Sequence, residues 1–178
     1  MDTEKKKLVM VAGPIGVGKT TVCRQLFKSM QGCAWLDADW CWMVNPYPGK
    51  TAEQKRYAER AFGYILDGYL NDGNTQIVLF SWAIQSDFMF SLVTSQIACT
   101  NYDLTKIALV CDEREYVSRM KADGRDEEKI IHHDSMDRYY ALDAVKIDTT
   151  HLSVCATAEK ILSLIEQGNL QISDYPGC

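Results

Sequence analysis

Eight consecutive residues near the N-terminus carry the strongest signal in the chain: Gly13-Pro14-Ile15-Gly16-Val17-Gly18-Lys19-Thr20. They match the pattern GxxxxGK[ST] at every fixed position. Glycines let backbone N–H groups turn inward around phosphate oxygens, and the start of the following helix adds the positive end of its dipole. In this pattern Lys19 reaches the β- and γ-phosphates of a nucleotide, and the Thr20 hydroxyl ligates Mg²⁺. We therefore expect these residues, together with Thr21, to bind ATP.

The residues on either side of this loop have the pattern that the motif requires. Leu8 to Ala12 form a compact apolar run, which predicts a buried strand, and residues 18 to about 30 have the apolar spacing of a helix. Farther along, predicted strands at 33–37, 76–81, 106–111 and 145–147 alternate with predicted helices, the first of them at about 52–70 and the last at about 154–165. This alternation predicts a mainly parallel sheet with helices on both faces, which binds ligands at the carboxyl ends of its strands.

Length and composition are those of one globular domain. The chain has 178 residues, of which 47% are hydrophobic and 24% charged, with a formal net charge of −5. We expect a single domain over 1–168 and a C-terminal tail over 169–178. The acidic balance argues against nucleic acid as a partner, and no run of apolar residues is long enough to span a membrane. Seven scattered cysteines without a CxxC pair argue against a zinc site or a disulfide framework and suit a cytoplasmic protein.

Two carboxylates follow the second predicted strand, in the sequence Trp35-Leu36-Asp37-Ala38-Asp39. If strand pairing continues through Asp39, both side chains point to the same side, toward the phosphate loop. Magnesium prefers hard oxygen ligands, and an acceptor hydroxyl needs a base within hydrogen-bonding reach. One or both aspartates can meet those needs. The alternative for Asp39 is that it only caps the next turn.

The loop and the Asp-x-Asp strand end, about seventeen residues apart, resemble those of the small P-loop kinase superfamily. This superfamily includes nucleoside-monophosphate, shikimate and gluconate kinases, and chloramphenicol phosphotransferase-like and tunicamycin-resistance-like proteins. The resemblance implies an α/β three-layer P-loop NTPase fold with a five-stranded parallel sheet in the order 2-3-1-4-5. It also implies an ATP- and Mg²⁺-dependent phosphotransferase that acts on a small acceptor, in which Asp37 assists the metal or acts as base and Asp39 touches the acceptor.

Arginines near the fourth predicted helix are candidates for binding the transferred phosphoryl group: Arg114, Arg119, Arg125 and Arg138. The planar guanidinium group suits phosphate oxygens. In the kinases that the chain resembles, an arginine before a short lid lies near the adenine and lid arginines clamp the phosphates. The resemblance implies a lid at about 119–128, with Arg119 near the adenine and Arg125 on the phosphates. The alternative is solvated arginines that pair with acids one helical turn away, such as Glu115.

The residues after the fifth predicted strand, Lys146 to Thr150, have two interpretations. In similar kinases the loop at this position approaches the adenine ring. Alternatively, Thr149, Thr150 or Ser153 caps the last helix.

Aromatic residues gather around the expected acceptor site, after the Asp pair and after the third strand: Trp40, Trp42, Tyr47 and Trp82. Apolar walls with few polar groups are typical of a small-molecule pocket, although ordinary packing explains each residue equally well. We expect Trp40 and Trp82 to contact a flat or apolar acceptor, with a helix within about 45–72 alongside. Arg56 and Arg60 on that helix either bind an acceptor phosphate, if the acceptor is a nucleotide, or form a solvated face.

One feature departs from many P-loop ATPases: the third strand ends Leu79-Phe80-Ser81-Trp82, without an acidic residue. The sequence therefore fits a motor or switch ATPase less well, and Thr20 and Asp37 are the residues expected to bind the metal. It also keeps open a competing interpretation, an ATP-binding regulatory or degenerate kinase-fold protein without phosphotransfer. The expected partner is a small acceptor (a nucleotide, a nucleoside or another hydroxyl compound), and the chain is expected to be a monomer or a homodimer.

Overall fold

The computed structural model describes residues 5–45, 51–125 and 136–166, and is built on one sheet of five parallel strands. The strands are β1 (Lys6–Ala12), β2 (Cys33–Asp37), β3 (Ile77–Ser81), β4 (Tyr102–Val110) and β5 (Val145–Asp148). Their order in the sheet is β2-β3-β1-β4-β5. The predicted parallel sheet and strand order are therefore confirmed.

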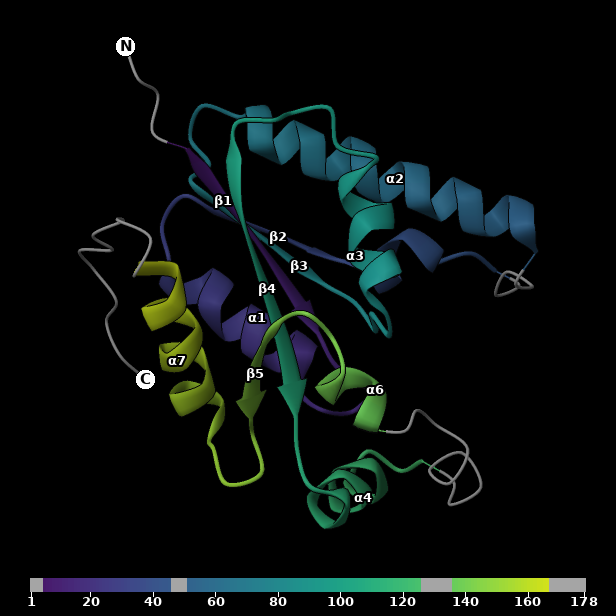
Figure 1. The fold of residues 1–178 in the computed structure, drawn as a ribbon, viewed down its shortest axis with the longest axis vertical. Helices are drawn as coiled ribbons and strands as arrows, with labels where there is room; N and C mark the ends of the chain where they lie inside the picture. The colour runs from purple at the N-terminus through teal and green to yellow at the C-terminus, as the bar shows by residue number, and fades with distance from the viewer. Residues whose placement is uncertain (1–4, 46–50, 126–135, 167–178) are drawn as a thin grey trace.

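Helices cover both faces of the sheet (Figure 1). One face packs against α1 (Lys19–Ser29) and α7 (Val154–Glu166), and the other against α2 (Ala52–Asn71) and α3 (Asp87–Thr94). Two further helices, α4 (Glu113–Ala122) and α6 (Met136–Tyr140), lie toward the carboxyl ends of β4 and β5. Among the helices of the described residues, none combines the length and the apolar character needed to cross a membrane.

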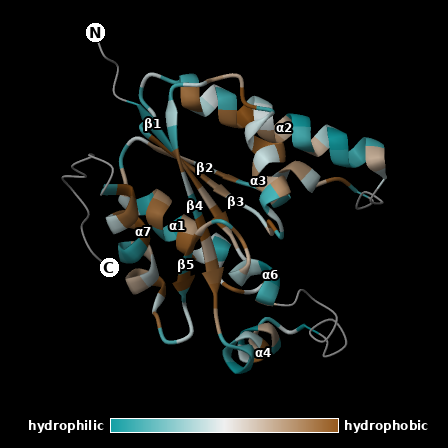
Figure 2. Ribbon diagram, in the orientation of Figure 1, coloured by the Kyte–Doolittle hydropathy of each residue, from teal (hydrophilic) through white to brown (hydrophobic). Residues whose placement is uncertain are grey.

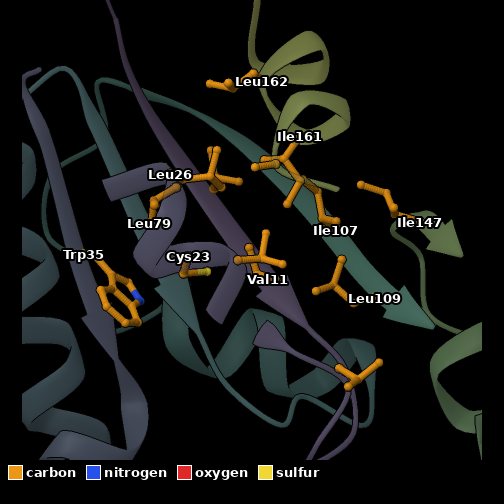
Figure 3. Close-up of a cluster of buried hydrophobic side chains, with 14 of the residues drawn as sticks. Val11, Cys23, Leu26, Trp35, Leu79, Ile107, Leu109, Ile147, Ile161 and Leu162 are labelled. Carbon is orange, nitrogen blue, oxygen red and sulfur yellow. The ribbon is translucent and has the colours of Figure 1, made fainter. Parts of the chain in front are cut away.

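The hydrophobic core is divided in two by the sheet, because successive strand side chains point to opposite faces. In β1, Val9 and Val11 belong to the cluster under α1 and α7, and Leu8, Met10 and Ala12 to the cluster under α2 and α3. Figure 2 shows the strands as the most hydrophobic part of the molecule, and Figure 3 shows the first cluster, with Leu26 and Ile161 from the covering helices. Burial on both faces explains why β1 is continuously apolar and does not alternate.

The ends of three elements, β4, α3 and α7, show how polar residues begin a strand or a helix. β4 begins four residues before the predicted Lys106, because Tyr102 to Thr105 pair with β1 although Asp103 and Leu104 are exposed. Ser86 is the N-cap residue of α3, but its side chain makes no capping hydrogen bond. The last helix is capped by Ser153, whose hydroxyl accepts from the Ala156 N–H at 3.1 Å.

The packing of α2 gives a prediction about stability. A Cβ atom added at Gly63 would lie 2.5 Å from the backbone oxygen of Gln96, whereas one added at Gly68 meets nothing within 4 Å. We expect Gly63→Ala to lower the free energy of unfolding by about 1–3 kcal/mol, because backbone cannot move aside as a side chain can. Gly68→Ala, on the same helix, should raise it by about 0.5–1 kcal/mol, because alanine loses less conformational entropy. Urea denaturation of both variants tests this, and equal effects would contradict it.

Candidate active site

The phosphate loop joins β1 to α1 in a backbone conformation that its glycines make possible. Gly16 and Gly18 have φ values of 84° and 106°, in the left-handed region that residues with a Cβ atom rarely adopt. Gly18 is the N-cap of α1, so the first N–H groups of that helix face the loop. The ammonium group of Lys19 donates to the backbone oxygens of Gly13 at 2.9 Å and Pro14 at 2.8 Å. The loop thus has the form of an anion cradle with its lysine across it.

The hydroxyl and the carboxylate that the sequence assigns to a metal lie together. Thr20 Oγ1 donates to Asp37 Oδ2 at 2.8 Å, and Asp37 is 5% exposed at the end of β2. Both groups offer the hard oxygen atoms that Mg²⁺ prefers. No cluster of three or more acidic, histidine or cysteine side chains suitable for a metal occurs in the part of the chain that the structure describes. The pair fits a magnesium ion that takes its other ligands from nucleotide phosphates and water.

Asp39 lies on a short turn and not on a continued strand. β2 ends at Asp37, and a 3₁₀ helix, η1 (Ala38–Trp42), follows, so the condition that pairing extends through Asp39 is not met. Asp37, not Asp39, is the capping residue: its Oδ1 accepts from the Asp39 N–H at 3.1 Å. Partial burial, and the charge of Asp37 in second place, raise the pKa of Asp39 above its usual value, and Lys19 offsets this in part.

This raised pKa gives a prediction for the protein without nucleotide. An acid whose pKa is higher in the folded state than in the unfolded state favours the folded state while it is protonated. This contribution to stability is lost as the pH rises through the folded-state pKa, and the ionised group then destabilises the fold. Asp39→Asn should therefore raise the free energy of unfolding at pH 7, by less than about 1 kcal/mol because much of the side chain is still in contact with water. The gain should shrink as the pH approaches 3.8, the ordinary pKa of the group. Asp103→Asn is the surface control, and a destabilised Asp39→Asn protein at pH 7 would contradict the prediction.

The end of β3 supplies a neutral hydroxyl where many P-loop ATPases have an acid. Ser81 pairs in register with Asp37, is fully buried and accepts from Trp35 Nε1 at 3.0 Å. The same hydroxyl bonds the Cys23 thiol, whose pKa is raised by its own burial. These contacts make Ser81 part of the packing beneath the loop, and the carboxylates of the site come from β2 and η1.

Arg119 connects three parts of the site. Its guanidinium group donates to the backbone oxygen of Val17 in the loop at 3.1 Å, and to Thr149 after β5 at 2.9 Å (Oγ1) and 2.7 Å (backbone oxygen). It also pairs with Glu115 at 2.7 Å, one turn earlier on α4. The ion pair with Glu115 that the sequence allowed is therefore present. Arg119 also connects the phosphate loop with the residues that follow β5. Sequence spacing could indicate only the Glu115 contact.

One cavity of about 620 Å³ brings most of the predicted residues together: its walls include Lys19, Thr20, Asp37, Asp39, Arg119 and Arg125. Thr21, Thr149 and Trp82 also line it. The guanidinium group of Arg125 lies 4.0 Å from the carboxylate of Asp123.

Several candidates lie away from this cavity. Trp40 is 51% exposed and packs edge-on against Trp35, with ring centroids 4.8 Å apart. Arg56 and Arg60 are exposed on α2, and none of these three candidates is among the residues that line the cavity. Arg138 donates to Gln85 at 3.3 Å. Tyr47 and the predicted lid beyond residue 125 lie outside the described residues.

A parallel sheet in this order, with a phosphate loop between its first strand and first helix, defines the class of small P-loop kinase-like proteins. Within that class, the chain belongs to the AAA domain family, whose model matches residues 9–140. The resemblance inferred from the loop and the Asp pair is thereby confirmed. A search of curated protein sequences finds no match.

Solved structures of P-loop kinases share this fold over nearly the whole chain. The tunicamycin resistance protein of Deinococcus radiodurans superposes with a TM-score of 0.65 at 16% identity, over 94% of this chain and 98% of that one. An APS kinase of Mycobacterium tuberculosis, in complex with AMPPNP and APS, gives 0.64 at 12% identity over 92% and 99%. A shikimate kinase of Acinetobacter baumannii, in complex with shikimate, gives 0.60 at 18% identity over 94% and 97%. At these identities the likeness shows the fold.

Proposed function

We propose that this protein is a small-molecule kinase, which transfers the γ-phosphate of ATP to a hydroxyl group of a small acceptor with the help of Mg²⁺. The observation that carries the proposal is the hydrogen bond between Thr20 and Asp37 beside Lys19, in one cavity. It joins a metal-binding pair to a phosphate cradle. The APS kinase structure, which has the same fold, holds a nucleotide analogue and a small molecule, which supports the assignment at the level of the class.

The nucleotide phosphates bind to the loop amides and to Lys19. To reach them, the Lys19 ammonium group gives up its hydrogen bonds to the backbone oxygens of Gly13 and Pro14. Thr20 and Asp37 hold the magnesium ion, and a bound ion there supplies positive charge to the phosphate oxygens. Arg119 on α4, with Arg125 three residues after the end of that helix, supplies further positive charge to the cavity.

The two carboxylates then have different tasks. Both oxygens of Asp37 already accept hydrogen bonds, from Thr20 and from the Asp39 N–H, so this side chain is held in place for the metal. Asp39 lines the cavity, and its raised pKa makes it a stronger proton acceptor than an ordinary aspartate. Asp39 accordingly orients the acceptor hydroxyl and accepts its proton as the hydroxyl attacks the γ-phosphate in line.

A second candidate function is nucleotide binding without transfer. The neutral Ser81 at the end of β3 favours it, because many ATP-hydrolysing relatives of this motif use an acid at that position. Such a protein would bind MgATP and would form no phosphorylated product.

The deciding experiment measures ADP formation with MgATP against a panel of nucleosides, nucleoside monophosphates, sugars, hydroxy acids and aromatic alcohols. Mass spectrometry identifies the phosphorylated compound. We expect acceptor-dependent ADP formation with at least one compound class. Tight MgATP binding without product across the panel would instead support the binding-only function.

A further inference from the structure

One peptide unit of the phosphate loop accepts a hydrogen bond from a side chain far along the chain. Arg119 Nη1 donates to the backbone oxygen of Val17 at 3.1 Å. A trans peptide unit is planar, so its C=O and N–H bonds point in opposite directions. The bond to Val17 therefore also fixes the direction of the Gly18 N–H, which belongs to the same peptide unit and points away from Arg119. Gly18 lines the cavity beside Lys19.

Gly18 makes this peptide unit easy to turn. Its φ value of 106° lies in a region that glycine adopts about as readily as negative φ values. Rotation about the bonds on either side of the peptide can therefore exchange the positions of the N–H and the carbonyl oxygen at low steric cost. An N–H that faces a phosphate donates a hydrogen bond to it, whereas a carbonyl oxygen is an acceptor and repels the anion. A restraint on this peptide therefore bears directly on phosphate binding.

Thr149 holds the nitrogen atom that makes this bond. The same Nη1 of Arg119 donates to Thr149 Oγ1 at 2.9 Å, and Nη2 donates to the backbone oxygen of Thr149 at 2.7 Å. Thr149 is 3% exposed and is anchored on the end of β4: its hydroxyl and its N–H both donate to the backbone oxygen of Val110, at 3.1 Å and 2.8 Å. Because the single hydroxyl proton is used on Val110, the Thr149 oxygen is left as an acceptor for Arg119.

Further contacts hold α4 against the loop. Met120, the residue after Arg119, is 1% exposed, and its sulfur atom lies 2.5 Å from the position that a Cβ atom on Gly16 would take. Met120 thus packs directly on the loop backbone. Glu115, one turn earlier, accepts from Arg119 Nε at 2.7 Å. All three nitrogen atoms of the guanidinium group are engaged in this way, so its orientation relative to the loop is fixed.

From this series of hydrogen bonds we infer that Thr149 is a positioning residue of the phosphate site. Acting through Arg119, it keeps the Val17–Gly18 peptide turned so that the Gly18 N–H faces the nucleotide phosphates. The inference rests on the ATP binding that the proposed function requires, and it adds to that function a residue that acts through another side chain. It also makes the contribution of Arg119 depend on the geometry of its hydrogen bonds, which a lysine cannot reproduce, and not on charge alone.

Calorimetry with MgAMPPNP measures the effect on nucleotide affinity without turnover. Thr149→Val keeps the size of the side chain but loses the acceptor oxygen, and we expect it to weaken binding about tenfold. Thr149→Ser, which keeps the hydroxyl, should bind within about threefold of the wild type. If Thr149→Val does not fold, Arg119→Lys tests the same bonds and should also weaken binding about tenfold. Wild-type affinity in Thr149→Val or in Arg119→Lys would overturn the inference.

The matched control is Thr75→Val. Thr75 is 8% exposed, and its hydroxyl donates to the carboxylate of Asp72 at 2.7 Å, before the start of β3 and at the opposite end of that strand from the site. Loss of this buried hydroxyl should lower stability and leave the affinity for MgAMPPNP unchanged. An equal loss of affinity in Thr75→Val and Thr149→Val would reduce Thr149 to a general structural role and overturn the inference.

A double-mutant cycle tests whether Thr149 acts through Arg119. In the Arg119→Lys protein, Thr149→Val should weaken MgAMPPNP binding by less than about twofold further, because the contact is already lost. A further tenfold loss would show that Thr149 acts by another route. The Gly18 amide resonance of the nucleotide-free protein reports on the peptide itself: it should be a single sharp signal in the wild type and in Thr149→Ser, and broadened by exchange in Thr149→Val. An unchanged Gly18 signal in Thr149→Val would contradict the inference.

These measurements separate the inference from the proposed function. A protein that binds MgAMPPNP, shows the effects of Thr149 and forms no product would count against the kinase proposal alone. Product formation with unchanged nucleotide affinity in Thr149→Val would count against the inference alone. A wild-type protein that does not bind MgAMPPNP would overturn both.

Discussion

Asp37→Asn is expected to lower kcat by about a thousandfold or more while the protein remains folded and still binds ATP. The carboxylate accepts from Thr20 at 2.8 Å and is the buried acid of the proposed metal pair. An asparagine keeps the shape and one acceptor oxygen, but it lacks the negative charge that attracts Mg²⁺. Single-turnover measurement of product formation, with the magnesium dependence of the rate, checks this result.

The matched control for this variant is Asp103→Asn. Asp103 is an exposed acid near the amino end of β4, where it pairs with Lys5 at 3.3 Å. The site lies at the carboxyl ends of the strands, so the loss of this carboxylate should leave kcat unchanged. If Asp37→Asn retained full turnover at ordinary magnesium concentration, the assignment of Thr20 and Asp37 as the metal pair would be wrong. If neither protein formed product but both bound MgATP equally, the binding-only function would be favoured.

Lys19→Ala should lower kcat/KM by about a thousandfold and remove most of the thermal stabilisation that MgATP confers. The ammonium group is the cation placed on the loop itself, where it donates to the carbonyls of Gly13 and Pro14. Without it, the γ-phosphate loses a charge-assisted hydrogen bond in the ground state and in the transition state. Melting curves with and without MgATP, together with steady-state rates, measure both effects.

Lys28→Ala provides a control on the same helix. Lys28 is exposed in the last turn of α1, away from the loop, so its removal should change neither the MgATP-induced melting shift nor the rate. An undiminished melting shift in Lys19→Ala would show that the loop does not bind phosphate as described.

Much of the fold could be predicted because its signals are local. The strand order and the parallel sheet followed from the resemblance carried by the loop and the Asp pair, and from alternating apolar runs. The predicted strand boundaries were wrong where a strand contains exposed or polar residues. The first residues of β4, such as Asp103, are exposed and carry no apolar signal, although they pair with β1. The second strand ends at Asp37, as predicted, but the sequence left open whether pairing continues through Asp39, and one hydrogen bond from the Asp39 N–H to Asp37 turns the chain into η1 instead.

The candidate site was predictable to the extent that its residues are consecutive. Residues 13–20 form a cradle through backbone dihedrals that glycines permit, so a motif of neighbouring residues is enough to specify it. The pairing of Thr20 with Asp37 was also foreseeable, because the parallel strands β1 and β2 end at the same edge of the sheet.

The sequence by itself determined the class of fold and the phosphate cradle, since both depend on residues close together in the chain. Only the tertiary structure decided which distant side chains meet: Arg119 with Thr149, Trp82 with the cavity, and Arg56 and Arg60 outside it. Such contacts depend on how each helix is rotated and how far it is displaced along the sheet. Packing of the whole core sets these quantities, and a shift of one or two residues along a helix turns a side chain from the cavity toward solvent.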